Sequence, residues 1–186
     1  MAEFTIAVLV GSLRKESINR KLARALEKLA AGKARFDFVQ IGDLPLYDQD
    51  FDSDYPAEGK RLKDQIKQAD AVLFVSPEYN RSVPGVLKNA IDIGSRPYGH
   101  SAFAGKPAAV IGASIGVIGT AVAQQHLRNI LAYLDMQVLG QPEAFLHFKE
   151  GLIDDNGTIT NEGTQKFLQD FVDRFIALVQ VHAKAA

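Results

Sequence analysis

No cysteine occurs in this sequence of 186 residues. The chain therefore has no disulfide, no thiol nucleophile and no thiolate metal ligand, which is typical of a reducing compartment. An apolar run of about 18 residues, the length needed to span a membrane, is also missing. The N-terminal residues lack the charged and apolar pattern of a secretion signal. We therefore expect a cytoplasmic protein with no membrane partner.

An excess of charge of either sign is missing as well. The 21 Lys and Arg residues nearly cancel the 22 Asp and Glu residues, and the net charge is −1. Without a basic stripe, nucleic acid is not an expected partner. No metal site is expected either, because the histidines do not show the close spacing of metal ligands; they are His100, His126, His147 and His182.

Apolar segments with strand spacing alternate with segments of helix spacing along most of the chain. The predicted strands cover residues 4–10, 35–40, 71–75, 107–113 and, more weakly, 136–139. Short crossovers of this kind favour parallel strands with right-handed connections. We predict an α/β protein with a flavodoxin-like, doubly wound, five-stranded parallel sheet in the order 2-1-3-4-5, three layers thick. A single domain over residues 1–186 is expected, with its ligand crevice beyond the carboxyl ends of strands one, three and four.

Two segments leave alternatives open. The final predicted helix, residues 164–182, is apolar over more than one narrow stripe. It either packs on a second subunit or is an unusually buried terminal helix. Residues 42–57 are polar, acidic and rich in turn formers, which indicates a solvated loop, with the rim of a binding site as the alternative.

The loop GSLRKESINRKLA, residues 11–23, leads from the first strand into the first helix. A helix N-terminus carries partial positive charge and free N–H groups, so cations are ordinarily unfavourable there. This one nevertheless sets four cations against one acid: Arg14, Lys15, Arg20 and Lys21 against Glu16. A bound phosphate would make the arrangement favourable. The alternative is that Ser17 is only an N-cap and the cations are solvated.

The candidate phosphate ligands are Ser12, Arg14, Ser17 and Asn19. The turn has no G-x-G-x-x-G pattern, and G-x-x-x-x-G-K-[ST] occurs nowhere in the chain. A monophosphate is therefore expected rather than a dinucleotide or a triphosphate.

The second loop, PEYNRS at residues 77–82, leaves the third strand beside this turn. Its backbone amides and the Asn80 side chain can read the polar edge of a flat heteroaromatic ring, and Tyr79 can supply an apolar face. In the alternative, Glu78 and Asn80 cap the turn and Tyr79 covers the core.

The third loop, IGASIGVIGT at residues 111–120, follows the fourth strand. Gly112, Gly116 and Gly119 let the backbone approach a ligand closely, and Ser114 adds a hydroxyl. The three loops converge where a doubly wound sheet binds ligands. A phosphate at one end and a planar ring at the other describe FMN.

These segments, together with HLRNILAYLDM at residues 126–136, resemble the NADPH-dependent FMN reductase family, in particular its bacterial quinone and chromate reductases. The resemblance runs over about residues 5–150. It implies one FMN per subunit, NAD(P)H as co-substrate, a homodimer or homotetramer, and two-electron reduction of quinones, with chromate as an opportunistic acceptor. By matching position it implies phosphate ligands at Ser12, Arg14, Ser17 and Asn19, a flavin-edge loop of Pro77, Glu78, Tyr79, Asn80 and Ser82, and an opposite wall of Ser114 and Gly116.

Three positions differ from the pattern common in that family and bear on the preferred acceptor: Ile93-Gly94, Ile115 and Thr120. Arg81 lies where it can meet the acceptor or a phosphate of the dinucleotide, and a solvated arginine is the alternative. In the expected mechanism the flavin carries the chemistry and no catalytic side chain is required. NAD(P)H delivers hydride and leaves before the acceptor binds, which gives ping-pong kinetics.

Two other functions compete with this one. Residues 112–116 match G-x-S-x-G with Ser114 as the nucleophile of a serine hydrolase, which needs an acid and a histidine from Asp135, Asp154, His147 and His182. A flavodoxin-like electron carrier ordinarily has a strongly acidic surface, and the net charge of −1 argues against it.

Overall fold

The computed structural model describes residues 4–185. At its centre is a parallel sheet in the order β2-β1-β3-β4-β5, the order of the flavodoxin-like doubly wound fold. The strands on this path are β1 (Phe4–Val10), β2 (Ala34–Phe38), β3 (Ala71–Val75), β4 (Pro107–Ser114) and β5 (Gln137–Val138). The predicted fold class and sheet order are confirmed, with small shifts at the strand ends.

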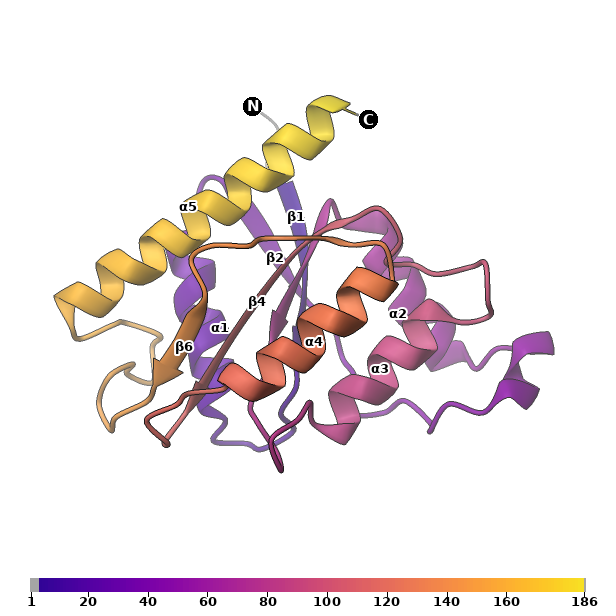
Figure 1. Cartoon of the computed structure of the whole chain (residues 1–186), viewed down its shortest axis with the longest axis horizontal. Coiled ribbons are helices and arrows are strands. Elements are labelled where there is room, and N and C mark those ends of the chain that lie inside the picture. Colours follow the sequence, from indigo (N-terminus) through magenta and orange to yellow (C-terminus); the bar gives the residue numbers. More distant parts are fainter. Residues whose placement is uncertain (1–3, 186) are drawn as a thin grey trace.

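Helices cover both faces of the sheet (Figure 1). Their bounds are α1 (Ile18–Leu29), α2 (Ala57–Gln68), α3 (Gly85–Ser95), α4 (Ala121–Tyr133) and α5 (Glu162–Ala185). In β1, Ile6 and Val8 belong to the core on the side of α1 and α5, whereas Ala7 and Leu9 belong to the core on the side of α2, α3 and α4. Because both faces are covered, the central strands are apolar at almost every position.

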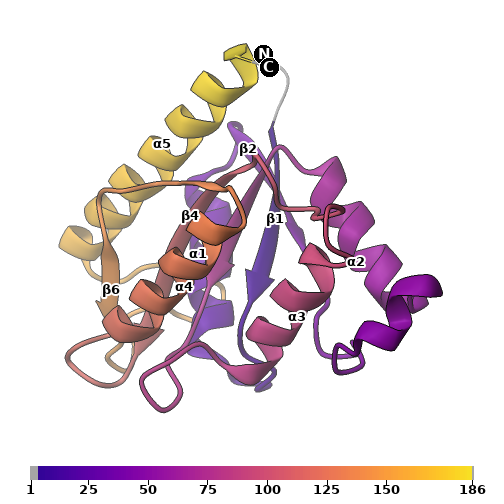
Figure 2. The ribbon, with the colours of Figure 1, turned by 45° about the vertical axis from the view of Figure 1, so that its right-hand side comes forward.

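The carboxyl ends of the central strands lie at one edge of the sheet. Val10 at the end of β1 pairs with Val75 at the end of β3, and Val75 pairs with Ile111 in β4. The loops that follow these strands therefore leave the sheet side by side, at the lower edge in Figure 2. This edge is where the sequence predicts the ligand crevice.

The edge beside β4 differs from the prediction of one strand over residues 136–139. Two short strands, β5 and β6 (Ala144–His147), both pair in parallel with β4. Ala108 pairs with Val138, and Ile111, three residues further along β4, pairs with Ala144, six residues further along the edge. The edge therefore contains three residues more than the stretch of β4 that it faces. The polar and turn-forming residues 140–143 interrupt the apolar pattern there, so β6 could not be predicted from the sequence.

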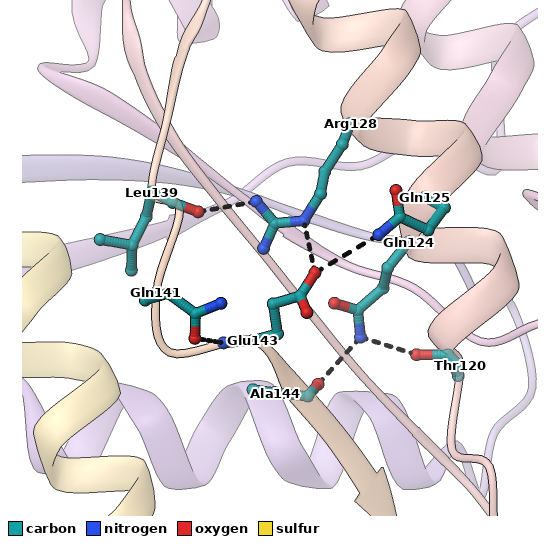
Figure 3. Close-up of polar contacts among 8 residues, drawn as sticks. All are labelled: Thr120, Gln124, Gln125, Arg128, Leu139, Gln141, Glu143 and Ala144. Atoms are coloured by element: carbon teal, nitrogen blue, oxygen red, sulfur yellow. Dashed lines mark hydrogen bonds and ion pairs between the residues drawn. The ribbon is translucent and has the colours of Figure 1, made fainter.

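Polar contacts fasten α4 to this interrupted edge (Figure 3). Arg128 Nη1 donates to the carbonyl of Leu139 at 2.7 Å, and Arg128 Nε lies 3.8 Å from Glu143 Oε1. Burial lowers the pKa of Arg128, and the nearby Glu143 opposes that shift. The buried Gln124 donates from Nε2 to the carbonyl of Ala144 at 2.8 Å and to Thr120 Oγ1 at 2.9 Å. The N-terminal half of α4 is therefore held in a fixed position on the sheet.

Both segments that left alternatives open lie against the sheet and its helices. In α5, the buried side chains join the core on the α1 side, as expected of a buried terminal helix: Leu168, Phe171, Val172, Phe175, Ile176 and Val179. Residues 42–57 contain a short 3-10 helix, Gln49–Ser53, and are tied to α3, since Asn89 Nδ2 donates to the Pro45 carbonyl at 2.8 Å. Within residues 4–185, no helix is long and apolar enough to cross a bilayer.

Candidate functional site

The turn between β1 and α1 leaves a row of backbone donors free. Gly11 N donates to the Val75 carbonyl at 2.9 Å, which continues the pairing of β1 with β3. From Ser12 to Ser17, no backbone N–H has an acceptor within residues 4–185. Ser17 is the N-cap of α1, as the alternative interpretation expected, and its Oγ accepts from Arg20 N at 3.2 Å. Unpaired N–H groups at a helix N-terminus form a cradle for an anion.

The cations around this turn are mostly without acidic partners. Lys21 pairs with Asp155 at 2.5 Å, and this hydrogen bond raises the pKa of Lys21. Arg14, Lys15 and Arg20 are exposed and form no ion pair in the part of the chain that the structure describes. Cations left unneutralised at the positive end of a helix repel its dipole, so a bound anion would relieve an unfavourable arrangement.

A pocket of about 170 Å³ opens between this turn and the loops that follow β3 and β4. The predicted site residues that line it are Ser12, Arg14, Ser17, Asn19, Pro77, Glu78, Tyr79 and Ser114. Gly11 lets the first two loops approach each other, because a Cβ there would lie 3.1 Å from Leu87 Cδ2 and 3.3 Å from Pro77 Cδ. The loops that the sequence predicts to converge do enclose one pocket.

Asn19 lines the pocket, but its side chain is engaged with the backbone of the protein. Its buried side chain donates from Nδ2 to the Ala113 carbonyl at 2.9 Å and accepts at Oδ1 from Ala113 N at 2.9 Å. Both polar ends of the amide are thus engaged with the backbone of β4. Asn19 ties the start of α1 to the strand that carries the third loop.

The second loop is a tight hairpin. Tyr79 N donates to the Ser82 carbonyl at 3.1 Å, and Ser82 N donates to the Tyr79 carbonyl at 2.9 Å. Between them, Asn80 and Arg81 have φ values of 50° and 61°, which defines a type I′ turn. Asparagine tolerates this left-handed conformation, whereas for arginine it costs on the order of 1 kcal/mol. Such strain clusters at functional sites, although Asn80 and Arg81 themselves do not line the pocket.

Two polar side chains of this hairpin, Glu78 and Ser82, form hydrogen bonds with α4. Glu78 Oε2 accepts from Val122 N at 3.1 Å and Ala123 N at 3.0 Å. Ser82 Oγ lies 2.9 Å from Nδ1 of His126. Glu78 is therefore a cap, as the alternative expected, but it caps α4 and not its own turn. What this loop offers a ligand is its backbone and the half-exposed Tyr79.

The third loop is shaped by glycine at one position in particular. A Cβ at Gly112 would overlap with the Ser76 carbonyl and with Thr120 Oγ1, so the ends of β3 and β4 pack only with glycine there. Gly116 does not line the pocket; a Cβ there would lie 3.5 Å from Ser114 Oγ, an ordinary contact, and its N donates to Ser114 Oγ at 3.1 Å. His147 stands opposite Ser114 in the strand pairing. Within residues 4–185, however, no histidine or acid is hydrogen-bonded to Ser114, so the hydrolase triad is not formed.

Comparison with known proteins decides between the remaining interpretations. The family described as NADPH-dependent FMN reductase matches residues 4–151. The chain belongs to this family. It is 55% identical over 175 residues to a 2-hydroxy-1,4-benzoquinone reductase from a Burkholderia species, covering 94% of this chain and 96% of that protein. It is 53% identical over 180 residues to a quinone reductase from Pseudomonas putida, covering 96% of each.

A solved structure shows the same fold over the whole length. The flavoenzyme NAD(P)H:(acceptor) oxidoreductase FerB from Paracoccus denitrificans is 50% identical and superposes with a TM-score of 0.93, over 96% of this chain and 98% of that chain. The predicted family, enzyme class and use of FMN with NAD(P)H are confirmed. Membership of the FMN reductase family favours a flavin reductase over the hydrolase and the electron carrier.

The residues present fit the cofactor of the FMN reductase family. The free N–H groups from Ser12 to Ser17 and the unpaired Arg14 are the donor set that a phosphate monoester needs. Sequence reasoning missed Ile18 and Ala113, which complete the pocket lining together with Ile115, a position it had linked to the preferred acceptor. It named His126 only as a histidine without the spacing of metal ligands. No local pattern marks that residue, because its contact with Ser82 spans 44 positions of sequence.

Proposed function

We propose that this FMN reductase is an NAD(P)H:quinone oxidoreductase, built as one FMN-binding domain, which holds FMN in the pocket between the three loops. The observation that carries the proposal is the row of unpaired N–H groups beside Ser12 and Arg14, at the carboxyl end of β1. The names of two relatives, a benzoquinone reductase and a quinone reductase, support the class of acceptor.

The turn after β1 would hold the phosphate of FMN. Backbone N–H groups and the hydroxyls of Ser12 and Ser17 would donate to its oxygens, while Arg14 neutralises its charge. Ser12 is buried at the pocket, and its hydroxyl has no partner elsewhere in the described range, so it is free for this role. Asn19 would act indirectly, by fixing α1 on Ala113.

The other two loops would hold the ring. In the hairpin, the N–H groups of Glu78, Asn80 and Arg81 have no acceptor within residues 4–185 and are available to polar atoms at the ring edge. Pro77 and Tyr79 line one side of the pocket, and Ser114, followed by Gly116, forms the opposite wall. Bound FMN supplies the group that takes hydride from NAD(P)H and passes two electrons on, so no side chain has to act as acid or nucleophile.

Arg81 is the residue that we assign to the acceptor or to a phosphate of the dinucleotide. Its side chain is 67% exposed and lies 3.5 Å from Glu78 Oε1, a contact too long to hold the guanidinium firmly. An anionic acceptor such as chromate would be attracted by the same charge, which makes chromate an opportunistic substrate in this proposal.

Anaerobic spectroscopy of the purified protein tests the function. Protein loaded with FMN should lose its yellow colour when NADH or NADPH is added and regain it when a benzoquinone is added, over many turnovers. Bleaching without turnover of free quinone would contradict the proposal in favour of an electron carrier. Labelling of Ser114 by a fluorophosphonate in a colourless protein would contradict it in favour of a hydrolase.

We also propose a cytoplasmic homo-oligomer, a homodimer or homotetramer. A cavity of about 550 Å³ lies between the C-terminal parts of α3 and α4, and the Tyr98 and Tyr133 side chains on it are 82% and 75% exposed. Exposed aromatic residues of this kind are enriched at protein interfaces, and a second copy of the chain is the proposed partner. Light scattering should give a multiple of the 20.3 kDa chain mass, and Tyr133→Glu should lower it.

A further inference from the structure

The hairpin of residues 77–82 is fastened to α4 on both of its flanks. Before the turn, the Glu78 carboxylate accepts from the N–H groups of Val122 and Ala123. After the turn, Ser82 Oγ meets His126 Nδ1 at 2.9 Å. Within residues 4–185, the Ser82 side chain has no other hydrogen bond, so the second flank depends on His126.

The turn between these two points needs support from outside itself. Asn80 and Arg81 both have positive φ, and arginine strongly disfavours that region. A strained turn persists only where the surrounding structure holds it in place. The helix that holds it is itself held, because Gln124 and Arg128, which flank His126 in the sequence, bond to the carbonyls of Ala144 and Leu139 (Figure 3).

We propose that His126 is a positioning residue of the reductase: by holding Ser82, it keeps the strained turn in the conformation that places Tyr79 at the pocket and Arg81 beside it. The effect on turnover rests on the proposed function, whereas the effect on the hairpin does not. The hydroxyl of Ser82 can donate to a neutral imidazole or accept from a protonated one, so the contact is available in both charge states.

Amide hydrogen exchange of the FMN-loaded protein tests the tie directly. His126→Ala should speed exchange in a peptide covering residues 77–83 by about fivefold, the factor expected from the loss of one hydrogen bond. His126→Asn should restore slow exchange, because the asparagine amide can place a polar atom near the position of Nδ1. Gln125→Ala is the matched control, since that exposed side chain reaches Glu143 and not the hairpin.

Steady-state kinetics then test the link to the reaction. In His126→Ala, KM for the quinone or for NAD(P)H should rise about fivefold. Affinity for FMN should fall by a smaller factor, because the hairpin holds the ring while the phosphate turn is untouched. Ser82→Ala should reproduce this result from the other partner. The double variant should be no worse than either single variant if the two residues act through one contact.

Unchanged exchange in both single variants would overturn the inference, and so would faster exchange with unchanged KM values. A wild-type protein that holds FMN but does not turn over quinone would contradict the proposed function instead. In that case the exchange comparison still decides whether His126 holds the hairpin. If His126→Ala does not fold, Ser82→Ala gives the same decision.

Discussion

The two loops that flank the pocket use their polar groups in opposite ways. In the turn after β1, the N–H groups from Ser12 to Ser17 and the Arg14 side chain have no partner within residues 4–185. In the hairpin after β3, the side chains of Glu78 and Ser82 are engaged with α4. The first loop is therefore open to a charged ligand, whereas the second is braced by the protein and offers mainly its backbone.

This difference follows from what each loop would bind. A phosphate carries full charge and demands several donors, so polar atoms left free in the apo fold are stabilised when it binds. A ring edge needs only a few donors in fixed positions, and fixing them requires a rigid loop. In this proposal, similar residue types bind the ligand in one loop and stabilise the loop itself in the other.

Asn19→Ala should have the largest effect on stability. It removes two hydrogen bonds between α1 and Ala113 and leaves a buried gap, so we expect a loss of about 3 kcal/mol in the free energy of unfolding. Urea denaturation of the apoprotein measures this. Gln180→Ala, on an exposed face of α5, is the control and should change it by less than about 0.5 kcal/mol. An equally stable variant with weak FMN binding would return Asn19 to the ligand set.

Arg14→Ala should weaken FMN binding by roughly 30-fold, the factor for one lost charge-assisted hydrogen bond. The stability of the apoprotein should hardly change, because Arg14 forms no ion pair in the described chain. Fluorescence titration gives the Kd. Lys28→Ala removes the same charge from the last turn of α1 and should leave the affinity near that of the wild type. Equal losses in both variants would mean that only the overall charge matters.

Glu78→Ala should lower the free energy of unfolding by about 1–2 kcal/mol, since it leaves the N-terminus of α4 without its cap. Glu78→Gln keeps an acceptor oxygen and should lose about half as much. Thermal unfolding of the apoproteins compares the two. A large loss of FMN affinity in Glu78→Gln, with stability intact, would show that the carboxylate acts on the ligand after all.

Arg81→Gly should have the smallest effect, and in the opposite direction. Glycine adopts the φ of 61° without strain, so the free energy of unfolding should rise by about 0.5 kcal/mol. The KM for an anionic acceptor or for NAD(P)H should rise at the same time, because the guanidinium is lost. Urea denaturation measures the change in the free energy of unfolding, and steady-state kinetics measure the change in KM. Unchanged KM values would leave Arg81 as a solvated arginine.

Much of this could be predicted from the sequence, for identifiable reasons. The sheet order follows from long apolar runs separated by short crossovers. Phosphate binding by the turn after β1, inferred from cations placed where a helix dipole disfavours them, stays a prediction. Strand β6 could not be predicted, because residues 140–143 break the apolar pattern. The roles of Glu78 and Ser82 could not be predicted either. Their partners on α4 lie 44 residues or more away, and the local sequence is the same whether a side chain faces a ligand or a helix.

The most direct test of the central claim compares FMN with riboflavin, which has the same ring and no phosphate. If the free donors of the first loop exist to bind phosphate, wild-type protein should bind FMN at least about 100-fold more tightly than riboflavin, the factor for two or more lost charge-assisted contacts. In Arg14→Ala this preference should shrink by roughly 30-fold. Equal affinities for FMN and riboflavin in the wild-type protein would contradict the account.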